Sequence, residues 1–476
     1  MTISHQTPSP IACALTNEFS AKIEWRPVAD LHAFGRQARR HSPDQIAKIA
    51  CSIKKFGFLD PILIEENGAV LAGLARCEAA KILGMTDVPV IIASHLSAPE
   101  KRAYVLAANK LQELSAWNHD ILAEELRDLA AIDLDFDLEI TGFDKIEIEV
   151  LTTLDMEDGA DQMPAVSAKV VSRDGDIWAL GEHRLLCGDA TNSTCLSALM
   201  DGRLARTTFI DPPYNVAIKG HVTSKTSHRE FAMGVGEMSE PGFTDFLATS
   251  LSNVAAHMID GGIIYGCMDW RHALNMLGAQ SAAGLGLLNV CVWKKPNAGQ
   301  GSFYRSQHEL VFVFKVGVGS HLNRIQLGKF GRSRSNVWEY PGVNGLNAQS
   351  RADHAAHPTP KPVAMVQDAL LDSSEKGDLV IDVFGGGGTT LIAAERCGRH
   401  ARLIELDPLY VDTIVRRWQV YTGRRATLVA SGQTFDQITA ERWAKTQHPT
   451  LTTQGTRTRV RTRIIIPPAL SEQEAI

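Results

Sequence analysis

The stretch TTFIDPPYN, residues 207–215, decides how the rest of the chain is interpreted. Its first four residues favour a short buried strand, and the double proline ends that strand because neither ring can donate a ladder hydrogen bond. Asp211 is therefore predicted at the carboxyl end of a strand, the edge at which open α/β sheets bind ligands. Taken alone, the stretch is equally a common strand-ending Asp-Pro turn.

As a site, the four residues after this strand suit a planar base that carries an exocyclic amine. The amine lone pair is conjugated into the ring and is a poor nucleophile. If the Asp211 carboxylate and the Pro212 carbonyl accept the two amine protons, the nitrogen pyramidalises and its lone pair becomes available. The Tyr214 ring would stack on the base. The predicted catalytic residues are Asp211, Pro212, Pro213 and Tyr214.

A second pattern, DLVIDVFGGGGTTL at residues 378–391, predicts a strand, a glycine loop and a helix start. Glycines let the backbone approach a ligand closely, and a helix N-terminus favours a carboxylate. The dinucleotide fingerprint G-x-G-x-x-G needs its third glycine where this chain has Leu391 or Thr390, which argues against nicotinamide and flavin. The next strand, residues 401–405, ends in Glu405, an acid that can hold the two hydroxyls of a ribose.

These two patterns, with HPTPKP at residues 357–362 between them, resemble the amino-group DNA methyltransferases. The catalytic motif precedes the cofactor motif, as in the β subgroup of that family. Supporting segments are residues 188–189, 267–272 and 304–309, and the resemblance covers residues 174–430. So many motifs in one order make coincidence improbable.

The resemblance implies an α/β fold with a Rossmann-like doubly wound methyltransferase sheet, and S-adenosylmethionine as the cofactor. It places Asp189 near the cofactor adenine, and Thr359 and Lys361 at the carboxylate of its methionine end. The predicted cofactor-binding residues are Asp189, Thr359, Lys361, Asp382, Phe384, Gly386, Gly388, Thr389, Thr390 and Glu405.

Charge is unevenly distributed along a chain whose net charge is −6. Residues 120–163 hold fifteen acidic side chains against Arg127 and Lys145, a local charge of −13, whereas residues 291–351 carry +7. A DNA-binding surface with an acidic connector would give this separation, and a solvated face is the plain alternative. A target-recognition region is predicted at residues 295–350, with phosphate and base contacts from basic side chains. These are Lys294, Lys295, Arg305, Arg324, Lys329, Arg332 and Arg334.

The first part of the chain predicts a smaller α+β domain. Ser42 is a good helix cap, followed by a proline at the first helical position and a glutamine three residues after the cap. The run of strands and helices that follows, with Gly73-Leu74-Ala75-Arg76 opening a helix, resembles the amino-terminal domain of ParB-type partition proteins. In that family polar residues of this turn contact a nucleotide phosphate. Here Leu74 and Ala75 replace them, which leaves open both nucleotide binding and an accessory role in DNA contact or assembly.

The predicted layout is a tail, a ParB-like domain, an acidic linker, a methyltransferase domain and a flexible basic tail. Their boundaries are 1–20, 21–130, 131–173, 174–430 and 431–476. The eight cysteines are scattered and no His/Cys/Asp cluster has ligand spacing, so reduced thiols and no metal are expected. No apolar run reaches the length of a membrane span, and no signal-peptide layout is present. A cytoplasmic, nucleoid-associated protein is expected, and a homodimer is left open.

Double-stranded DNA is the expected partner and adenine N6 the favoured target, because cytosine N4 enzymes more often have Ser in place of Asp211. The alternatives are cytosine N4 methylation, a non-catalytic ParB-like DNA-binding protein and an RNA methyltransferase. A solitary enzyme is favoured over one paired with a restriction enzyme. All these interpretations require that Asp211 and the glycine loop lie in neighbouring crevices on one edge of one sheet.

Overall fold

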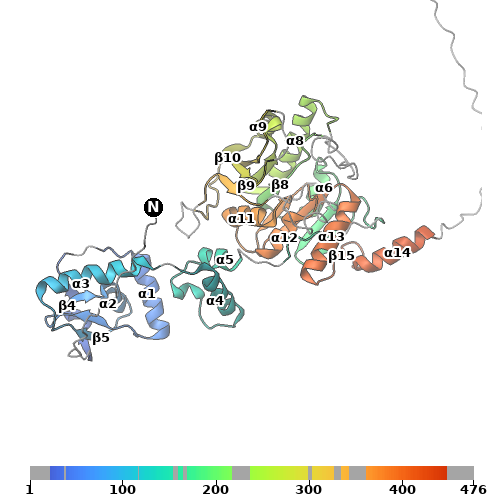
Figure 1. Cartoon of the computed structure of the whole chain (residues 1–476). Coiled ribbons are helices and arrows are strands. Elements are labelled where there is room, and N and C mark those ends of the chain that lie inside the picture. Colours follow the sequence, from blue (N-terminus) through green and yellow to red (C-terminus); the bar gives the residue numbers. More distant parts are fainter. Residues whose placement is uncertain are drawn as a thin grey trace, which may run out of the picture.

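The computed structural model describes residues 22–36, 39–115, 117–153, 159–164, 169–216, 236–298, 303–325, 334–341 and 361–447. Over these ranges the chain forms a five-stranded sheet in its N-terminal part and a ten-stranded sheet in the remainder (Figure 1). The predicted tail at 1–20 and the predicted site residues Thr359, Lys329 and Arg332 lie outside the described residues. Within the described ranges no helix is both long and apolar enough to span a bilayer.

The N-terminal domain is a mixed sheet with strand order β1-β5-β3-β4-β2 and helices packed on it. Its helix α1 begins as predicted, because the Ser42 side chain accepts a hydrogen bond from the Gln45 backbone N–H at 3.1 Å, and it ends at Gly57, whose φ is +86°. The elements are β1 (Ile23–Pro27), β2 (His32–Ala33), α1 (Pro43–Phe56), β3 (Ile62–Ile64), β4 (Ala69–Ala72), α2 (Leu74–Ile82), β5 (Asp87–Ile92) and α3 (Ala98–Lys110). The α+β architecture predicted for this part is confirmed.

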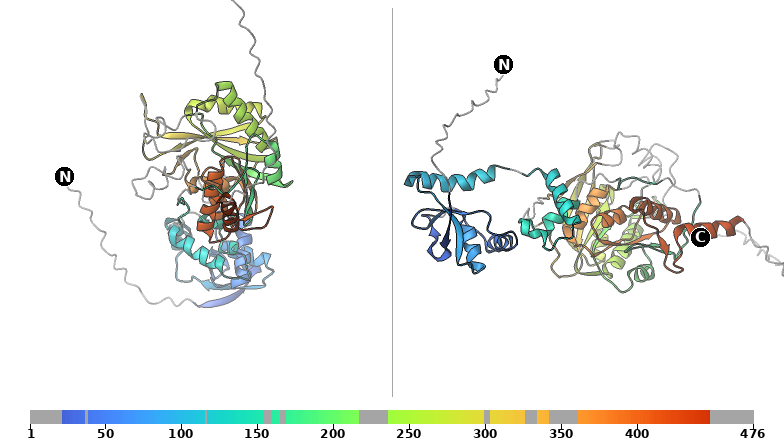
Figure 2. Two further views of the ribbon diagram at one scale, coloured as in Figure 1. Left: turned by 90° about the vertical axis from the view of Figure 1, so that its right-hand side faces the viewer. Right: turned by 90° about the horizontal axis from the view of Figure 1, so that it is seen from below.

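After α3 and the 3-10 helix η2 (Leu111–Leu114), three further helical elements connect this domain to the large sheet. They are α4 (His119–Ala131), the 3-10 helix η3 (Leu138–Thr141) and α5 (Lys145–Thr153). In Figures 1 and 2 they lie between the small domain and the large sheet. The segment predicted as an acidic linker therefore contains regular structure, and its contacts on both sides are described below.

The large sheet has the order β12-β10-β11-β9-β8-β13-β14-β7-β6-β15. Its centre, from β9 to β7, is parallel, and antiparallel strands flank it on both sides. The strands are β6 (Ile177–Leu180), β7 (His183–Cys187), β8 (Ala205–Ile210), β9 (Met258–Met268), β10 (Gly286–Lys294), β11 (His308–Lys315), β12 (Val337–Glu339), β13 (Leu379–Asp382), β14 (His400–Glu405) and β15 (Thr427–Leu428). The doubly wound sheet predicted from the sequence is confirmed.

Helices cover both faces of this sheet, as a doubly wound fold requires. On one face α6 (Ser193–Met200), α8 (Glu240–Ala255) and α9 (Ala273–Ala282) contribute to one apolar core. The residues of α11 (Val363–Ser373), α12 (Thr389–Arg396) and α13 (Pro408–Thr422) belong to a second core. Along β9, Ile263 and Tyr265 belong to the second core and Ile264 to the first, as the two-residue alternation of a strand dictates.

The register of two central strands tests the prediction that Asp211 and the glycine loop lie on one edge of one sheet. Strands β8 and β13 are adjacent and parallel, with Thr207 opposite Val380 and Thr208 opposite Ile381. Their carboxyl ends therefore meet at one edge of the sheet, so Asp211 and the glycine loop that starts at Gly385 are neighbours. The chain order of the strands reverses at this point, which is where open α/β sheets form their ligand crevice. The expectation is confirmed.

The folded part extends further toward the C-terminus than the predicted boundary at 430. Helix α14 (Phe435–Gln447) buries Phe435 and Ile438, and Arg442 forms an ion pair with Asp176 at 2.5 Å. The first part of the predicted flexible basic tail is therefore a helix packed on the β6–β7 hairpin. The four arginines of the predicted tail, from 457 to 463, lie outside the described residues.

Candidate active site

Asp211 directly follows β8, and both oxygens of its carboxylate have partners. Tyr214 Oη lies 2.9 Å from Asp211 Oδ1 and also 2.9 Å from Glu309 Oε2. Lys361 Nζ donates to Asp211 Oδ2 at 2.6 Å and lies 3.2 Å from Glu309 Oε2. Two carboxylates, a phenol and an ammonium thus form one network at the end of the central strand.

The two carboxylates in this network differ in acidity. Burial raises the pKa of Asp211, and the Lys361 ammonium only partly opposes that effect. Burial would also raise the pKa of Glu309, but Lys361 and Lys295 outweigh it and hold that pKa at about 2. Burial opposes the charge on Lys361, yet Asp211 and Glu309 raise the pKa of its ammonium, so it stays protonated. Asp211 is therefore the weaker acid and the group on which a proton is more readily held.

The glycine loop at the end of β13 is held by two buried carboxylates. Asp382 accepts hydrogen bonds from the Phe384 N–H at 3.0 Å and the Thr390 hydroxyl at 2.6 Å. Glu405, at the end of β14, accepts from the Gly386 N–H at 2.7 Å. Burial raises the pKa of both carboxyls to about 7. The loop thus presents backbone and two weakly acidic carboxyls to the same edge as Asp211.

Lys361 joins the two halves of the site. Its side chain contacts Asp211, while its backbone carbonyl accepts a hydrogen bond from the Thr389 hydroxyl at 3.3 Å, at the start of α12. Lys361 was expected at the carboxylate of a cofactor, but its buried ammonium is instead paired with Asp211 and Glu309. In this arrangement the Lys361 ammonium fixes the position of the Asp211 carboxylate.

Asp189 and Phe384 also lie at this edge. Strand β7 runs beside β14 with Cys187 opposite Glu405, so Asp189 lies just beyond the end of β7. One Asp189 oxygen accepts from the backbone N–H and the hydroxyl of Thr191, both at 2.8 Å. The Phe384 ring packs 5.8 Å from that of Phe246. Every predicted cofactor-binding residue that the structure describes therefore lies along one sheet edge.

The start of β11 lies at the same edge. Strand β11 is antiparallel to β9, with Leu310 opposite Met268, and β9 is parallel to β8. Residues 295–298 and 303–307, which precede β11, therefore lie at the edge that holds Asp211. Lys294 is about half exposed and pairs with Glu339 at 2.7 Å, and Arg305 is exposed. These two predicted DNA contacts, together with Lys295, therefore lie at the same edge of the sheet as Asp211.

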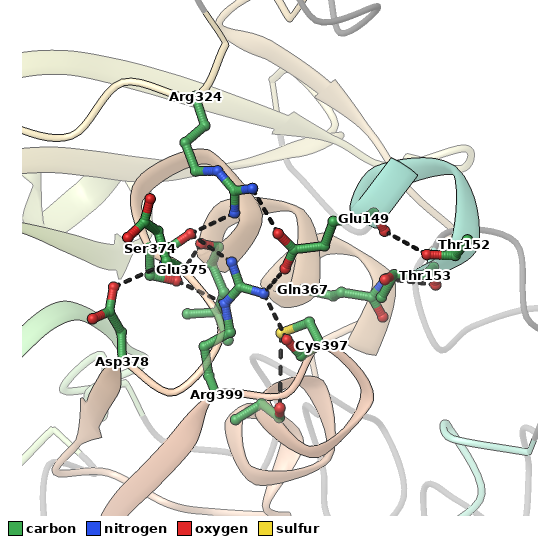
Figure 3. Close-up of polar contacts among 12 residues, drawn as sticks. Glu149, Thr152, Thr153, Arg324, Gln367, Ser374, Glu375, Asp378, Cys397 and Arg399 are labelled. Carbon is green, nitrogen blue, oxygen red and sulfur yellow. Dashed lines mark hydrogen bonds and ion pairs between the residues drawn. The ribbon is translucent and has the colours of Figure 1, made fainter. Parts of the chain in front are cut away.

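Two of the predicted DNA contacts are wrong. Arg324 is only 4% exposed, and its guanidinium forms an ion pair with Glu149 at 2.6 Å (Figure 3). Arg334 pairs with Asp368 at 2.6 Å and Asp372 at 2.9 Å on α11. Both arginines neutralise carboxylates inside the protein, so neither presents a charge to DNA in this structure. The predicted recognition region at 295–350 is also interrupted by β11, a strand of the central sheet.

Three residues of this edge could not be assigned a place in the site from the sequence. Glu309 was noted only as part of a motif, and nothing in its spacing showed that it would share Lys361 with Asp211. Phe303 and Tyr304 are 86% and 82% exposed, with ring centroids 4.5 Å apart. Two large exposed aromatic rings next to Arg305 form a surface on which a base can stack. The adjacent pair was readable in the sequence, but its exposure was not.

Comparison with known proteins identifies three families along the chain. A family described as DNA methylase, of the N6 and N4 type, matches residues 205–416. A ParB N-terminal domain matches residues 17–110, and a ParB-methyltransferase HTH domain matches residues 120–174. The last match falls on the segment predicted as an acidic linker.

Individual proteins are similar to separate parts of the chain. The ParB-like nuclease domain-containing protein YnaK of Escherichia coli K12 is 43% identical over 81 residues, which are 17% of this chain and 93% of that protein. The type II methyltransferase M2.MboI of Moraxella bovis is 24% identical over 225 residues, 45% of this chain and 80% of that one. Among solved structures, the cytosine-N4-specific PvuII DNA methyltransferase is 16% identical, with a TM-score of 0.40 over 58% of this chain and 94% of that one.

Proposed function

The chain belongs to the N6/N4 DNA methylase family and carries a ParB-like N-terminal domain, and on that premise we propose that it methylates adenine N6 in double-stranded DNA, with S-adenosylmethionine as the methyl donor. The observation that carries the proposal is the placement of Asp211 beside the glycine loop at the switch point of the sheet. Cytosine N4 is the second candidate, because the same geometry can activate either exocyclic amine.

The residues of the loop fit the proposed cofactor. Glu405 is buried, and each of its oxygens accepts one backbone N–H, from Gly386 at 2.7 Å and from Asp407 at 2.8 Å. A carboxylate has about four acceptor positions, so Glu405 can accept two further hydrogen bonds from a ribose diol. The N-terminus of α12, which begins after Gly388, favours the negative charge of the methionine carboxylate. The bound cofactor would supply an electrophilic methyl group.

The target base must leave the duplex to reach this edge. Flipping costs a few kcal/mol of unstacking and unpairing. Phosphate contacts from Lys294 and Arg305, and stacking on the Phe303–Tyr304 pair, offset part of that cost. Asp211 would then accept a hydrogen bond from one amine proton and the Pro212 carbonyl from the other, which frees the lone pair of the nitrogen for an in-line displacement. S-adenosylhomocysteine would leave with the electron pair of the broken S–C bond, and Asp211 would take the proton that the methylated amine releases.

The direct test of the function is expression in a host that lacks DNA methylation. The host DNA would be digested to nucleosides and analysed by mass spectrometry, and its modified positions sequenced. We expect N6-methyladenine at one recurring sequence, and none in cells that express Asp211→Ala. N4-methylcytosine would establish the second candidate instead, and the absence of both bases in cells with soluble protein would reject the proposal.

Glu405 predicts a pH dependence of cofactor binding. Burial raises the pKa of this carboxyl to about 7 in the unliganded protein. Ribose hydroxyls donate to the ionised form, so binding lowers this pKa and releases a proton near neutral pH. Affinity for S-adenosylhomocysteine should therefore rise as the pH increases from 6 to 8, by about tenfold for each unit by which binding lowers the pKa.

Titration calorimetry in phosphate and in Tris would measure both the affinity and the proton released, because the two buffers differ in ionisation enthalpy. Glu405→Gln should weaken binding at every pH and remove most of the pH dependence. A Glu405→Gln protein that kept the full dependence would contradict this assignment and point to Asp382, whose pKa is also about 7.

A further inference from the structure

The segment that matches the HTH family is strongly acidic, whereas DNA-binding domains are usually basic where they contact DNA. Residues 120–174 contain sixteen acidic and four basic side chains, a net charge of −12. Helices that bind DNA place Lys and Arg against the phosphates, and the resulting affinity is largely electrostatic. On α4 of this segment, Glu124, Glu125 and Asp128 are exposed instead. A DNA backbone next to this surface would meet like charge.

The acidic side chains face basic ones on the ParB-like domain. Lys48 Nζ, on α1, donates to Asp144 Oδ1 at 2.6 Å and to the Gly142 carbonyl at 2.8 Å. Two helical turns further along α1, Lys55 forms an ion pair with Asp135 at 2.5 Å. Next to it the Phe56 ring packs edge-on against Phe136, with centroids 5.8 Å apart. The contact combines charge complementarity with an apolar pair.

On the other side, α5 inserts a carboxylate into the methyltransferase domain. Glu149 is 6% exposed and lies between Arg324 and Arg399, which are 4% and 1% exposed (Figure 3). Arg324 also donates to the Ser374 carbonyl at 2.8 Å, and Arg399 Nε donates to the Ser374 hydroxyl at 3.0 Å. Burial alone would raise the pKa of Glu149, but the two guanidinium groups outweigh it and lower that pKa. Glu149 is therefore ionised and is the counter-ion that two buried arginines share.

The chain after Glu149 continues this contact. Gln367 Nε2 on α11 donates to the Thr153 carbonyl at 3.0 Å, which fixes the end of α5. Further along, Asp161 accepts the Val363 N–H at 2.9 Å, at the start of α11. Figure 3 shows the Glu149 and Thr153 contacts side by side. The segment thus has a specific, partly buried seat on the domain that holds the active site.

We infer that the helical segment 118–153 is an intramolecular adaptor that holds the ParB-like domain on the methyltransferase domain, and that it does not contact DNA. Its partners are basic surfaces of the same chain, Lys48 and Lys55 on one side and Arg324 and Arg399 on the other. The inference uses the proposed function only in taking DNA as the substrate. The contact of α5 with the methyltransferase domain can be tested without DNA.

The first experiment tests, in the full chain, the contact of Glu149 with the methyltransferase domain. Glu149→Gln leaves two buried guanidinium groups without a carboxylate, and removing one partner of a buried ion pair is strongly destabilising. We expect the melting temperature to fall by roughly 5–15 °C, and trypsin to cut faster between the ParB-like and methyltransferase domains. The matched control is Glu125→Gln on exposed α4, which should change neither property. A Glu149→Gln protein as stable and as protease-resistant as the parent would overturn the inference.

If Glu149→Gln does not fold, the triple variant Glu149→Met, Arg324→Met and Arg399→Met removes the cluster without leaving a buried charge. The triple variant should fold even where Glu149→Gln does not, and where both fold it should recover at least half of the lost melting temperature, because apolar replacement of a complete buried ion cluster is often tolerated. A triple variant no more stable than Glu149→Gln would show that the charges of Glu149, Arg324 and Arg399 do not hold α5 on the methyltransferase domain. That result would overturn the inference.

The second experiment tests whether the segment touches DNA. Arg127 and Lys145 are the two lysine or arginine residues within 118–153. Replacing both by alanine should leave the affinity for a fluorescent duplex, measured by anisotropy, within twofold of the parent value. In the comparison variant, Lys294 and Arg305 are replaced by alanine. A fivefold or larger loss in the Arg127/Lys145 variant would overturn the inference. Loss in neither variant, with methylation intact, would instead move the DNA surface away from the β11 edge and leave the adaptor standing.

Discussion

Replacing Asp211 by alanine is expected to lower kcat for methyl transfer by at least about 10²–10³-fold, while affinity for S-adenosylhomocysteine changes less than threefold. In the proposed mechanism the Asp211 carboxylate is the acceptor that prepares the target amine, and alanine offers none. The fold should tolerate the change, because Lys361 retains Glu309 as a counter-ion at 3.2 Å. Asp382 on β13 and Glu405 on β14 are proposed to bind the cofactor, and their hydrogen bonds run to Phe384, Thr390, Gly386 and Asp407 rather than to Asp211. Single-turnover transfer to duplex DNA and calorimetry with the product cofactor would separate the two effects.

Asp378→Ala is the matched control for this result. Asp378 immediately precedes β13 and pairs with Arg206, at the opposite edge of the same two strands. The Asp378→Ala variant should therefore retain the methyl-transfer activity of the parent. Asp211→Asn keeps one acceptor oxygen but loses the charge that Lys361 faces. Its methyl-transfer activity should therefore lie between that of Asp211→Ala and that of the parent. Parental activity in Asp211→Ala would remove the catalytic assignment, whereas parallel loss of cofactor affinity would indicate a structural role.

Much of the large domain could be predicted because its signals are local. A strand that ends in Asp-Pro-Pro and one that ends in a glycine run each mark a carboxyl edge, and parallel strands share that edge. The adjacency of β8 and β13 then brings Asp211 to the glycine loop. The helix start at Ser42 is local in the same way, since the cap and its partner Gln45 are three residues apart.

The arginine assignments failed because charge in a sequence carries no information on burial. Arg324 and Arg334 lie in a basic stretch, yet their partners Glu149 and Asp368 are on α5 and α11, far away in the chain. The ion-pair partners of Lys361 could not be predicted for a similar reason. Its motif lies beside the cofactor loop, but Glu309, on a strand that precedes it by about fifty residues, draws its ammonium toward Asp211. Long-range ion pairs of this kind need the fold itself.

The second large effect is expected in the glycine loop, where Gly388→Val should weaken S-adenosylhomocysteine binding by about 10²-fold, equivalent to about 2.7 kcal/mol. Gly388 caps α12 with a φ of +78°, a conformation that a β-branched residue strongly disfavours. A Cβ there would also lie 3.0 Å from Ile414 Cγ2, which is too close without a shift. Gly386→Val should act similarly, because Gly386 has a φ of +49° and its N–H donates to Glu405.

Gly398→Val separates loss of the site from general strain. Gly398 follows the other end of α12 with a φ of +67°, and a Cβ there meets Lys376 Cγ at an ordinary 3.5 Å. It should therefore lower the melting temperature by a few degrees, as left-handed strain of about 1–2 kcal/mol would, without changing cofactor affinity. Calorimetry would measure the cofactor affinity of all three variants, and thermal unfolding would measure their melting temperatures. If Gly388→Val bound as tightly as Gly398→Val, the glycine loop would not be the cofactor cradle, whatever the result at Asp211.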